Sequence, residues 1–133
     1  MSKYGQLTPQ VVTRLKQIVG ERNVIYGDAD RLESYSHDET GSLYSAMPDV
    51  VVKPISAEQI SEIMKLANRK MIPITPRGAG SGLAGGAVPL YGGIVLSCEK
   101  MDRILEIDTV NLVAVVEPGV ITNDLCQLVA EEG

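Results

Sequence analysis

The stretch from residue 76 to residue 93 constrains the fold most, because it follows neither a helical nor a strand period. It consists mainly of glycine, proline and other small residues, with glycines at positions 78, 80, 82, 85 and 86. Glycine loses more conformational freedom on folding than any other residue, so this density is costly unless the shape of the backbone requires it. Long irregular loops inside compact domains are usually functional. We therefore expect a loop whose backbone binds a ligand, in preference to a flexible surface loop.

A diphosphate suits such a loop chemically. Successive glycines let consecutive N–H groups turn into one concavity, and such a nest attracts phosphate oxygens without a net positive charge on the protein. Ser81 adds a hydroxyl donor. Arg77 is a cation at the edge of the loop, and its planar guanidinium can bind a phosphate, a carboxylate or a carbonyl.

Two common nucleotide-binding patterns do not fit the context. Residues 80–85 match G-x-G-x-x-G, but that fingerprint has to open a helix, and Pro89 and the glycines at 86, 92 and 93 forbid one of useful length. Gly86 and Ala87 stand where a P-loop needs Lys and Ser or Thr. We expect neither a Rossmann site nor a P-loop.

The segments around the loop predict an α+β fold. We expect helices over residues 9–19 and 57–70 and from 122 onward, a short helical turn near 29–33, and strands over 49–53, 72–75, 93–97, 104–108 and 112–117. The first two strands and the helix between them form a βαβ unit, which implies parallel strands. The last two strands form an antiparallel hairpin.

Local signals mark where the expected helices begin. Thr8 followed by Pro9 is an N-cap with proline at the first helical position. Ser56 and Gln59 form a capping box, and Thr122 is expected to cap the last helix. The inward face of the second helix is expected to carry Ile60, Ile63, Met64 and Ala67.

Charge and composition exclude several kinds of partner. The chain has 133 residues, enough for one domain or part of one, and a formal net charge of -5, which disfavours nucleic acid and anionic membranes. Neither a signal segment nor a transmembrane run is present, so we expect a cytoplasmic protein. Cys98 and Cys126 lack metal-site spacing and are expected to be buried thiols in a reducing compartment.

The run His37-Asp38-Glu39 invites interpretation as a metal or acid–base site. Adjacent loop residues rarely converge on one point, so we expect these side chains to be structural or solvated.

The order of PDVVVKP, IPITPRGAGSGLAGGAVP, GGIVLS, MDRILEID and VAVVEPGV resembles the FAD-binding domain of the vanillyl-alcohol oxidase and p-cresol methylhydroxylase (PCMH) type. The most similar branch is that of D-lactate dehydrogenase and of a glycolate oxidase subunit. The resemblance implies that residues 1–34 are an N-terminal helical segment and that residues 35–133 are the first, incomplete part of the FAD-binding domain. It implies a cofactor site at Pro76, Arg77, Gly78, Ala79, Gly80, Ser81, Gly82, Gly85, Gly86, Ala87, Pro118 and Gly119.

Many relatives tether FAD through a histidine in this loop, whereas the only histidine here is His37, so the resemblance implies non-covalent FAD. It also implies a parent enzyme that oxidises a 2-hydroxy acid such as glycolate or D-lactate, works with further oxidase subunits and meets the membrane only through them. The catalytic residues would lie outside this chain, which alone would be inactive and would self-associate through apolar surface. The alternative is a non-catalytic folded module or another FAD or nucleotide-phosphate binder.

Overall fold

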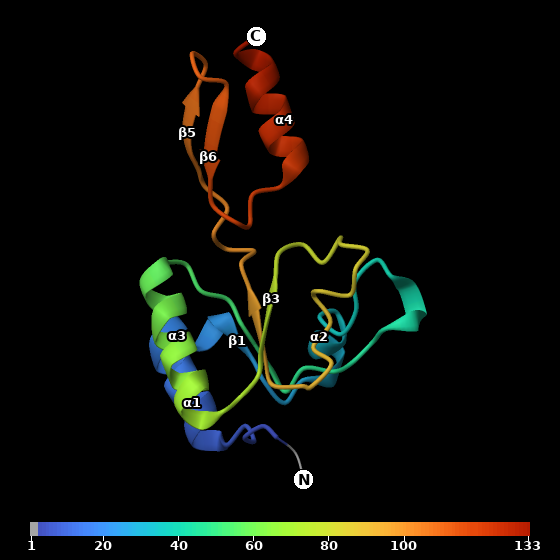
Figure 1. Cartoon of the computed structure of the whole chain (residues 1–133). Coiled ribbons are helices and arrows are strands. Elements are labelled where there is room, and N and C mark those ends of the chain that lie inside the picture. Colours follow the sequence, from blue (N-terminus) through green and yellow to red (C-terminus); the bar gives the residue numbers. More distant parts are fainter. Residues whose placement is uncertain (1–2) are drawn as a thin grey trace.

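The computed structural model describes residues 3–133, except for the side chain of Ser42. Its α-helices are α1 (Pro9–Val19), α2 (Ala29–Glu33), α3 (Ala57–Lys70) and α4 (Thr122–Glu131), with 3-10 turns at Glu21–Asn23 and Gly41–Leu43. Its strands are β1 (Val24–Ile25), β2 (Val50–Val52), β3 (Ile74–Arg77), β4 (Ile94–Ser97), β5 (Ile104–Asp108) and β6 (Val113–Val116). Figure 1 shows a body built on one sheet, from which β5, β6 and α4 project. The α+β class is confirmed.

Helices α1 and α3 begin where their local sequences predict. The Thr8 hydroxyl accepts a hydrogen bond from the Val11 amide at 3.4 Å, and the Ser56 hydroxyl accepts one from the Gln59 amide at 3.2 Å. The Gln59 side chain accepts from the Ile55 amide, one residue before the cap. The expectation for Thr122 is wrong. Thr122 is already the first residue of α4, and the N-cap is Ile121, which has no side-chain oxygen to offer.

The four-stranded sheet has the order β1-β2-β4-β3. Strands β2 and β3 are parallel, as the βαβ pattern predicts, but β4 lies between them and pairs with both in parallel. Strand β3 begins two residues later than expected. The edge strand β1, antiparallel to β2, was not predicted, because two residues are too few to show a period.

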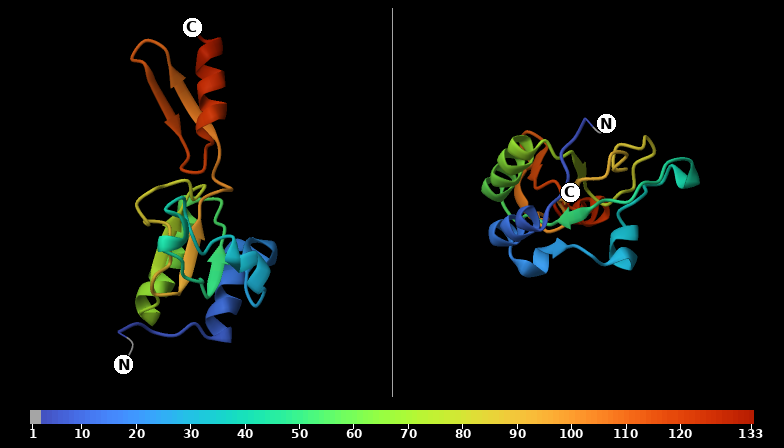
Figure 2. Two further views of the ribbon diagram at one scale, coloured as in Figure 1. Left: turned by 90° about the vertical axis from the view of Figure 1, so that its right-hand side faces the viewer. Right: turned by 90° about the horizontal axis from the view of Figure 1, so that it is seen from below.

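Apolar side chains cover both faces of this sheet. Helices α1 and α3 pack on one face, and α2 contributes Leu32 to the other, where it meets Val51 and Val95. Figure 2 shows α1 and α3 side by side against the sheet. On α3, Ile63 and Ala67 are buried as predicted, whereas Met64 is 47% exposed, so its placement on the inward face is wrong. Leu66 lies inward instead, since it shares the face of Ile63 at i+3.

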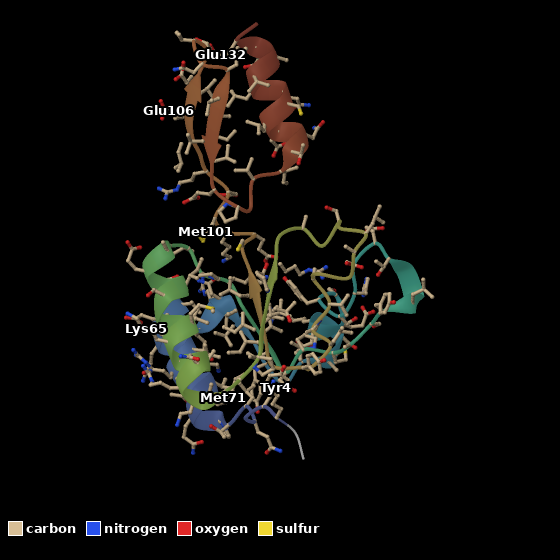
Figure 3. The ribbon with its side chains drawn as sticks, viewed as in Figure 1. Tyr4, Lys65, Met71, Met101, Glu106 and Glu132 are labelled. Carbon is tan, nitrogen blue, oxygen red and sulfur yellow. The ribbon has the colours of Figure 1, made fainter. Side chains whose placement is uncertain are left out.

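The C-terminal part forms a separate layer beyond the sheet. Strands β5 and β6 form the predicted antiparallel hairpin, closed by a turn in which the Asp108 carboxylate accepts from the amides of Val110 and Asn111. Figure 3 places Met101 where the chain passes from the body to this hairpin, and Glu106 and Glu132 on the projecting part. No residue of α4 is buried, and all of β6 is exposed. The layer therefore presents apolar surface on Leu105, Val110, Leu112, Val113, Ile121 and Val129.

The two cysteines differ in environment. Cys98, which follows β4, is half-buried, and burial raises the pKa of its thiol. Cys126 on α4 is exposed, so the expectation of two buried thiols is wrong for it. No residue of α4 is buried, so the exposure of Cys126 is shared by the helix as a whole.

Candidate cofactor site

The glycine loop is positioned by the parallel strands on either side of it. It leaves the sheet after Arg77 at the carboxyl end of β3 and returns to β4 at Gly93 (Figure 1). The Cys98 amide donates to the Arg77 carbonyl at 2.8 Å, and the Gly119 amide donates to the Met101 carbonyl at 2.7 Å. These bonds bring the start of the loop beside the turn at residues 118–120, although some 40 residues separate the two in the chain.

The first half of the loop has free backbone donors. In the described part of the chain, the amides of residues 78–84 donate no hydrogen bond, and the next backbone–backbone bond of the loop joins the Val88 amide to the Gly85 carbonyl at 3.2 Å. A Cβ atom added at Gly82 or Gly86 would meet nothing within 4 Å, so these positions border open space. Gly85 has a φ of 72°, which L residues with side chains avoid. Free amides around open space are what a phosphate-binding loop requires.

A pocket of about 380 Å³ adjoins the start of the loop. Among the predicted site residues, Arg77, Gly78, Ala79 and Gly119 line this pocket. Pro118 lies close by, since its carbonyl oxygen is 3.9 Å from the place that a Cβ of Gly78 would take. The other predicted residues do not line it: Pro76 lies in β3, and residues 80–82 and 85–87 lie along the rest of the loop.

The Arg77 side chain binds carbonyls, one of the three partners expected for it. Its guanidinium donates to the carbonyl oxygens of His37 at 2.6 Å and Ser34 at 3.3 Å, and it lies 5.5 Å from the centre of the Tyr35 ring. Gly80 has a φ of 74°, which favours glycine, and a side chain there would also displace the guanidinium. Arg77 thus ties the loop to residues 34–37 and leaves phosphate contact to the backbone amides.

Gly119 has a structural explanation of its own. A Cβ there would overlap the carbonyl oxygens of Cys98 and Met101. The turn can therefore approach the end of β4 only with glycine at this position, whether or not a ligand is bound.

A cluster of polar side chains beside the pocket was not predicted. Lys53 forms an ion pair with Glu99, and Glu99 also accepts from the hydroxyls of Tyr35 and Ser97, each at 3.1 Å. Burial opposes the charge on both ionised groups, but their mutual contact prevails, so the pKa of Lys53 is raised and that of Glu99 is lowered. Lys53 follows β2 and Glu99 follows β4, and these parallel strands are neighbours in the sheet. Because the carboxyl ends of adjacent parallel strands lie together, the positions of the two residues after their strands could have predicted the pair.

Asp38 is buried against the glycine loop, whereas its neighbour His37 is exposed. The amide and hydroxyl of Thr40 both donate to Asp38 Oδ1, and these bonds lower the pKa of the carboxyl. The Glu39 amide donates to the Gly82 carbonyl at 3.0 Å. These bonds agree with the structural interpretation of Asp38. In the described residues no group of three or more His, Cys, Asp or Glu could hold a metal ion, and no helix is long and apolar enough to cross a membrane.

Comparison with known proteins matches the family described as "FAD binding domain" over residues 48–133. The D-lactate dehydrogenase of Anaerostipes hadrus is 39% identical over 98% of this chain and 27% of its own length. The glycolate oxidase subunit GlcD of Bacillus subtilis is 42% identical over 96% of this chain and 27% of its own length. The chain thus spans about a quarter of the length of these relatives.

A solved structure with a similar fold is p-cresol methylhydroxylase with bound substrate. It superimposes with a TM-score of 0.79 at 28% identity, over 92% of this chain and 24% of the other. The family match covers more than half of the chain, including β2 to β6, the glycine loop and α4. The chain therefore belongs to the family of FAD-binding domains found in FAD-linked oxidoreductases of the PCMH type.

Proposed function

We propose that the glycine loop and the turn at 118–120 hold the FAD. The diphosphate would accept hydrogen bonds from the amides of residues 78–82, and residues 85–87 would lie toward the flavin. The full set is Pro76, Arg77, Gly78, Ala79, Gly80, Ser81, Gly82, Gly85, Gly86, Ala87, Pro118 and Gly119. The run of amides without acceptors, bordered by open space, is the observation that carries this proposal.

The charges around the pocket favour its occupation by the adenosine half of FAD. Glu99, Asp102 and Asp124 line the pocket, so a phosphate inside it would meet carboxylates. Ribose hydroxyls, in contrast, are hydrogen-bond donors that carboxylates accept well. We therefore place the sugar in the pocket and the diphosphate at the neighbouring amides.

FAD would be bound without a covalent link. The chain has one histidine, His37, and its ring is engaged with the Ser36 hydroxyl at 3.1 Å and with Glu33 at 3.8 Å. By the family resemblance, Gly80-Ser81-Gly82 is the stretch of the loop that matches the one in which many members have a tethering histidine, and it contains none. The affinity would then rest on hydrogen bonds and packing alone.

In the whole protein, bound FAD would accept a hydride from the Cα atom of a 2-hydroxy acid such as glycolate or D-lactate. This chain's residues bind and orient the cofactor, and the residues that bind the substrate and remove its hydroxyl proton would lie in the remaining three quarters. The chain alone would be inactive. The names of the relatives support the substrate class, and the relative called a subunit supports the presence of further oxidase subunits. Our proposal also includes a cytoplasmic location, with membrane contact only through such subunits.

The test uses the protein at its full natural length. Purified protein is stripped of flavin and reconstituted with FAD, and the released flavin is measured after acid precipitation. We expect stoichiometric FAD that remains in the supernatant. Glycolate or D-lactate, added without oxygen, should then bleach the visible flavin absorbance. Failure to bind FAD would refute the cofactor site, FAD in the pellet would refute non-covalent binding, and bleaching by neither acid would refute glycolate and D-lactate as substrates.

A further inference from the structure

One oxygen of a buried carboxylate next to the glycine loop has no hydrogen-bond partner. Asp38 is 4% exposed, and its Oδ1 atom is satisfied by Thr40. Its Oδ2 atom is buried and accepts no hydrogen bond from any described residue. A buried carboxylate oxygen without a donor is costly, so a native protein normally supplies one.

The backbone of the glycine loop offers a donor for this oxygen. The Glu39 amide bonds to the Gly82 carbonyl at 3.0 Å, which brings this part of the loop to Asp38. The Gly85 amide is the loop donor that faces the Asp38 carboxylate, and it helps to lower the pKa of this group after the larger contributions of Thr40. The same amide has no other acceptor in the described chain. The Arg77 guanidinium, the nearby cation, already donates to the carbonyls of His37 and Ser34. Asp38 Oδ2 and the Gly85 amide are thus complementary groups, and neither has any other hydrogen-bond partner among the described residues.

Residues 34–40 hold the loop at two other points. Arg77 anchors the start of the loop to Ser34 and His37, and the Gly82 carbonyl accepts from the Glu39 amide. Neither contact restrains the second half of the loop, which runs from Gly85 to Gly93. Asp38 lies between these anchors in the sequence, and its free oxygen is suited to restrain that half.

We propose that Asp38 is a positioning residue, which holds the second half of the glycine loop by accepting the Gly85 amide at Oδ2. The contact between Asp38 and Gly85 does not depend on the proposed function, whereas its effect on FAD binding rests on that function. A peptide at Gly85 that faces Asp38 has a fixed orientation, and the amides that follow are then oriented in advance for the cofactor. Binding to such a pre-arranged loop avoids the entropic cost of ordering it.

The test compares three variants of the full-length protein. Asp38→Asn keeps an oxygen for Thr40 but replaces the other with an NH₂ donor, which cannot accept an amide. Thr40→Val removes one bond to Oδ1 and leaves Oδ2 unchanged. Asp108→Asn makes the same chemical change in a capped turn at the tip of the hairpin, away from the loop. Hydrogen exchange of residues 82–87 is measured without FAD, and the dissociation constant of FAD is measured separately.

We expect Asp38→Asn to speed exchange at Gly85 about tenfold or more and to weaken FAD binding by about tenfold to a hundredfold. The other two variants should leave both quantities within about threefold of the wild type, a difference worth less than about 0.7 kcal/mol. Unchanged exchange at Gly85 in Asp38→Asn would overturn the proposal, as would equal effects in Thr40→Val. Faster exchange in a protein that takes up no FAD would support the positioning role and refute the proposed function instead.

Discussion

Replacing Gly82 by alanine should separate folding from cofactor binding. Gly82 lies in the run of free amides, its φ is outside the positive range that side chains avoid, and an added Cβ would meet nothing within 4 Å. The folded protein without FAD thus has no steric reason for glycine at this position. If glycine is needed there, the need comes from a ligand.

Gly82→Ala is expected to raise the stability of the protein without FAD and to lower its affinity for FAD. Gly→Ala at a compatible backbone conformation reduces the entropy of the unfolded chain and stabilises a protein by about 0.4–1 kcal/mol. The same methyl group would enter the open space that the diphosphate is proposed to occupy. Forcing an extra methyl group into a packed contact costs about 1–3 kcal/mol, which corresponds to roughly a fivefold to 150-fold loss of affinity.

Two measurements on the full-length protein check this. Urea unfolding without FAD gives the stability, and titration of the stripped protein with FAD gives the dissociation constant. Gly85→Ala is the matched control, because Gly85 has a φ of 72° and should lose about 1–2 kcal/mol of stability as well as affinity. If Gly82→Ala destabilises the FAD-free protein as much as the control does, the glycine is structural. If its affinity for FAD is unchanged, the diphosphate does not lie at Gly82.

Three further predictions concern stability and association. Ile63→Ala should cost about 2–5 kcal/mol of unfolding free energy, whereas Met64→Ala should change it by less than about 0.5 kcal/mol, because only Ile63 is buried. Equal losses in urea unfolding would contradict the orientation of α3, with Ile63 inward and Met64 outward. Glu117 has a lowered pKa, chiefly through hydrogen bonds from the Arg103 side chain and amide, so its stabilisation is complete above the ordinary glutamate pKa and is lost as the pH falls through the lowered value. The difference in unfolding free energy between wild type and Glu117→Gln should therefore shrink in acid, and a difference that grew in acid would refute this linkage. The isolated 133-residue chain should self-associate through the apolar surface of residues 104–129, and a clean monomer in concentrated solution by sedimentation would argue against that.

Features that depend on neighbouring residues could be predicted from the sequence. The starts of α1 and α3 are set by the hydroxyls of Thr8 and Ser56, each of which bonds to an amide three residues later. The hairpin of β5 and β6 follows from two apolar runs around a short polar turn. The glycine loop could be identified because its composition excludes regular structure, and its motif led to the FAD-binding family.

Features that depend on distant residues could not be predicted. The sequence shows which segments form strands but not their order, and β4 lies between β2 and β3 because long-range pairing decides the sheet. Arg77 bonds to a carbonyl 40 residues away, and Tyr35 to a carboxylate 64 residues away.

The local elements of this protein, its glycine loop and its family can all be recognised from the amino-acid sequence. Folding is needed to bring Arg77 to the carbonyls of residues 34 and 37, to bring Lys53 to Glu99 beside the pocket, and to bury Asp38 with one oxygen free. The physical reason is that a cap or turn is closed by bonds between near neighbours, whereas these contacts exist only after the sheet brings separate strand ends together.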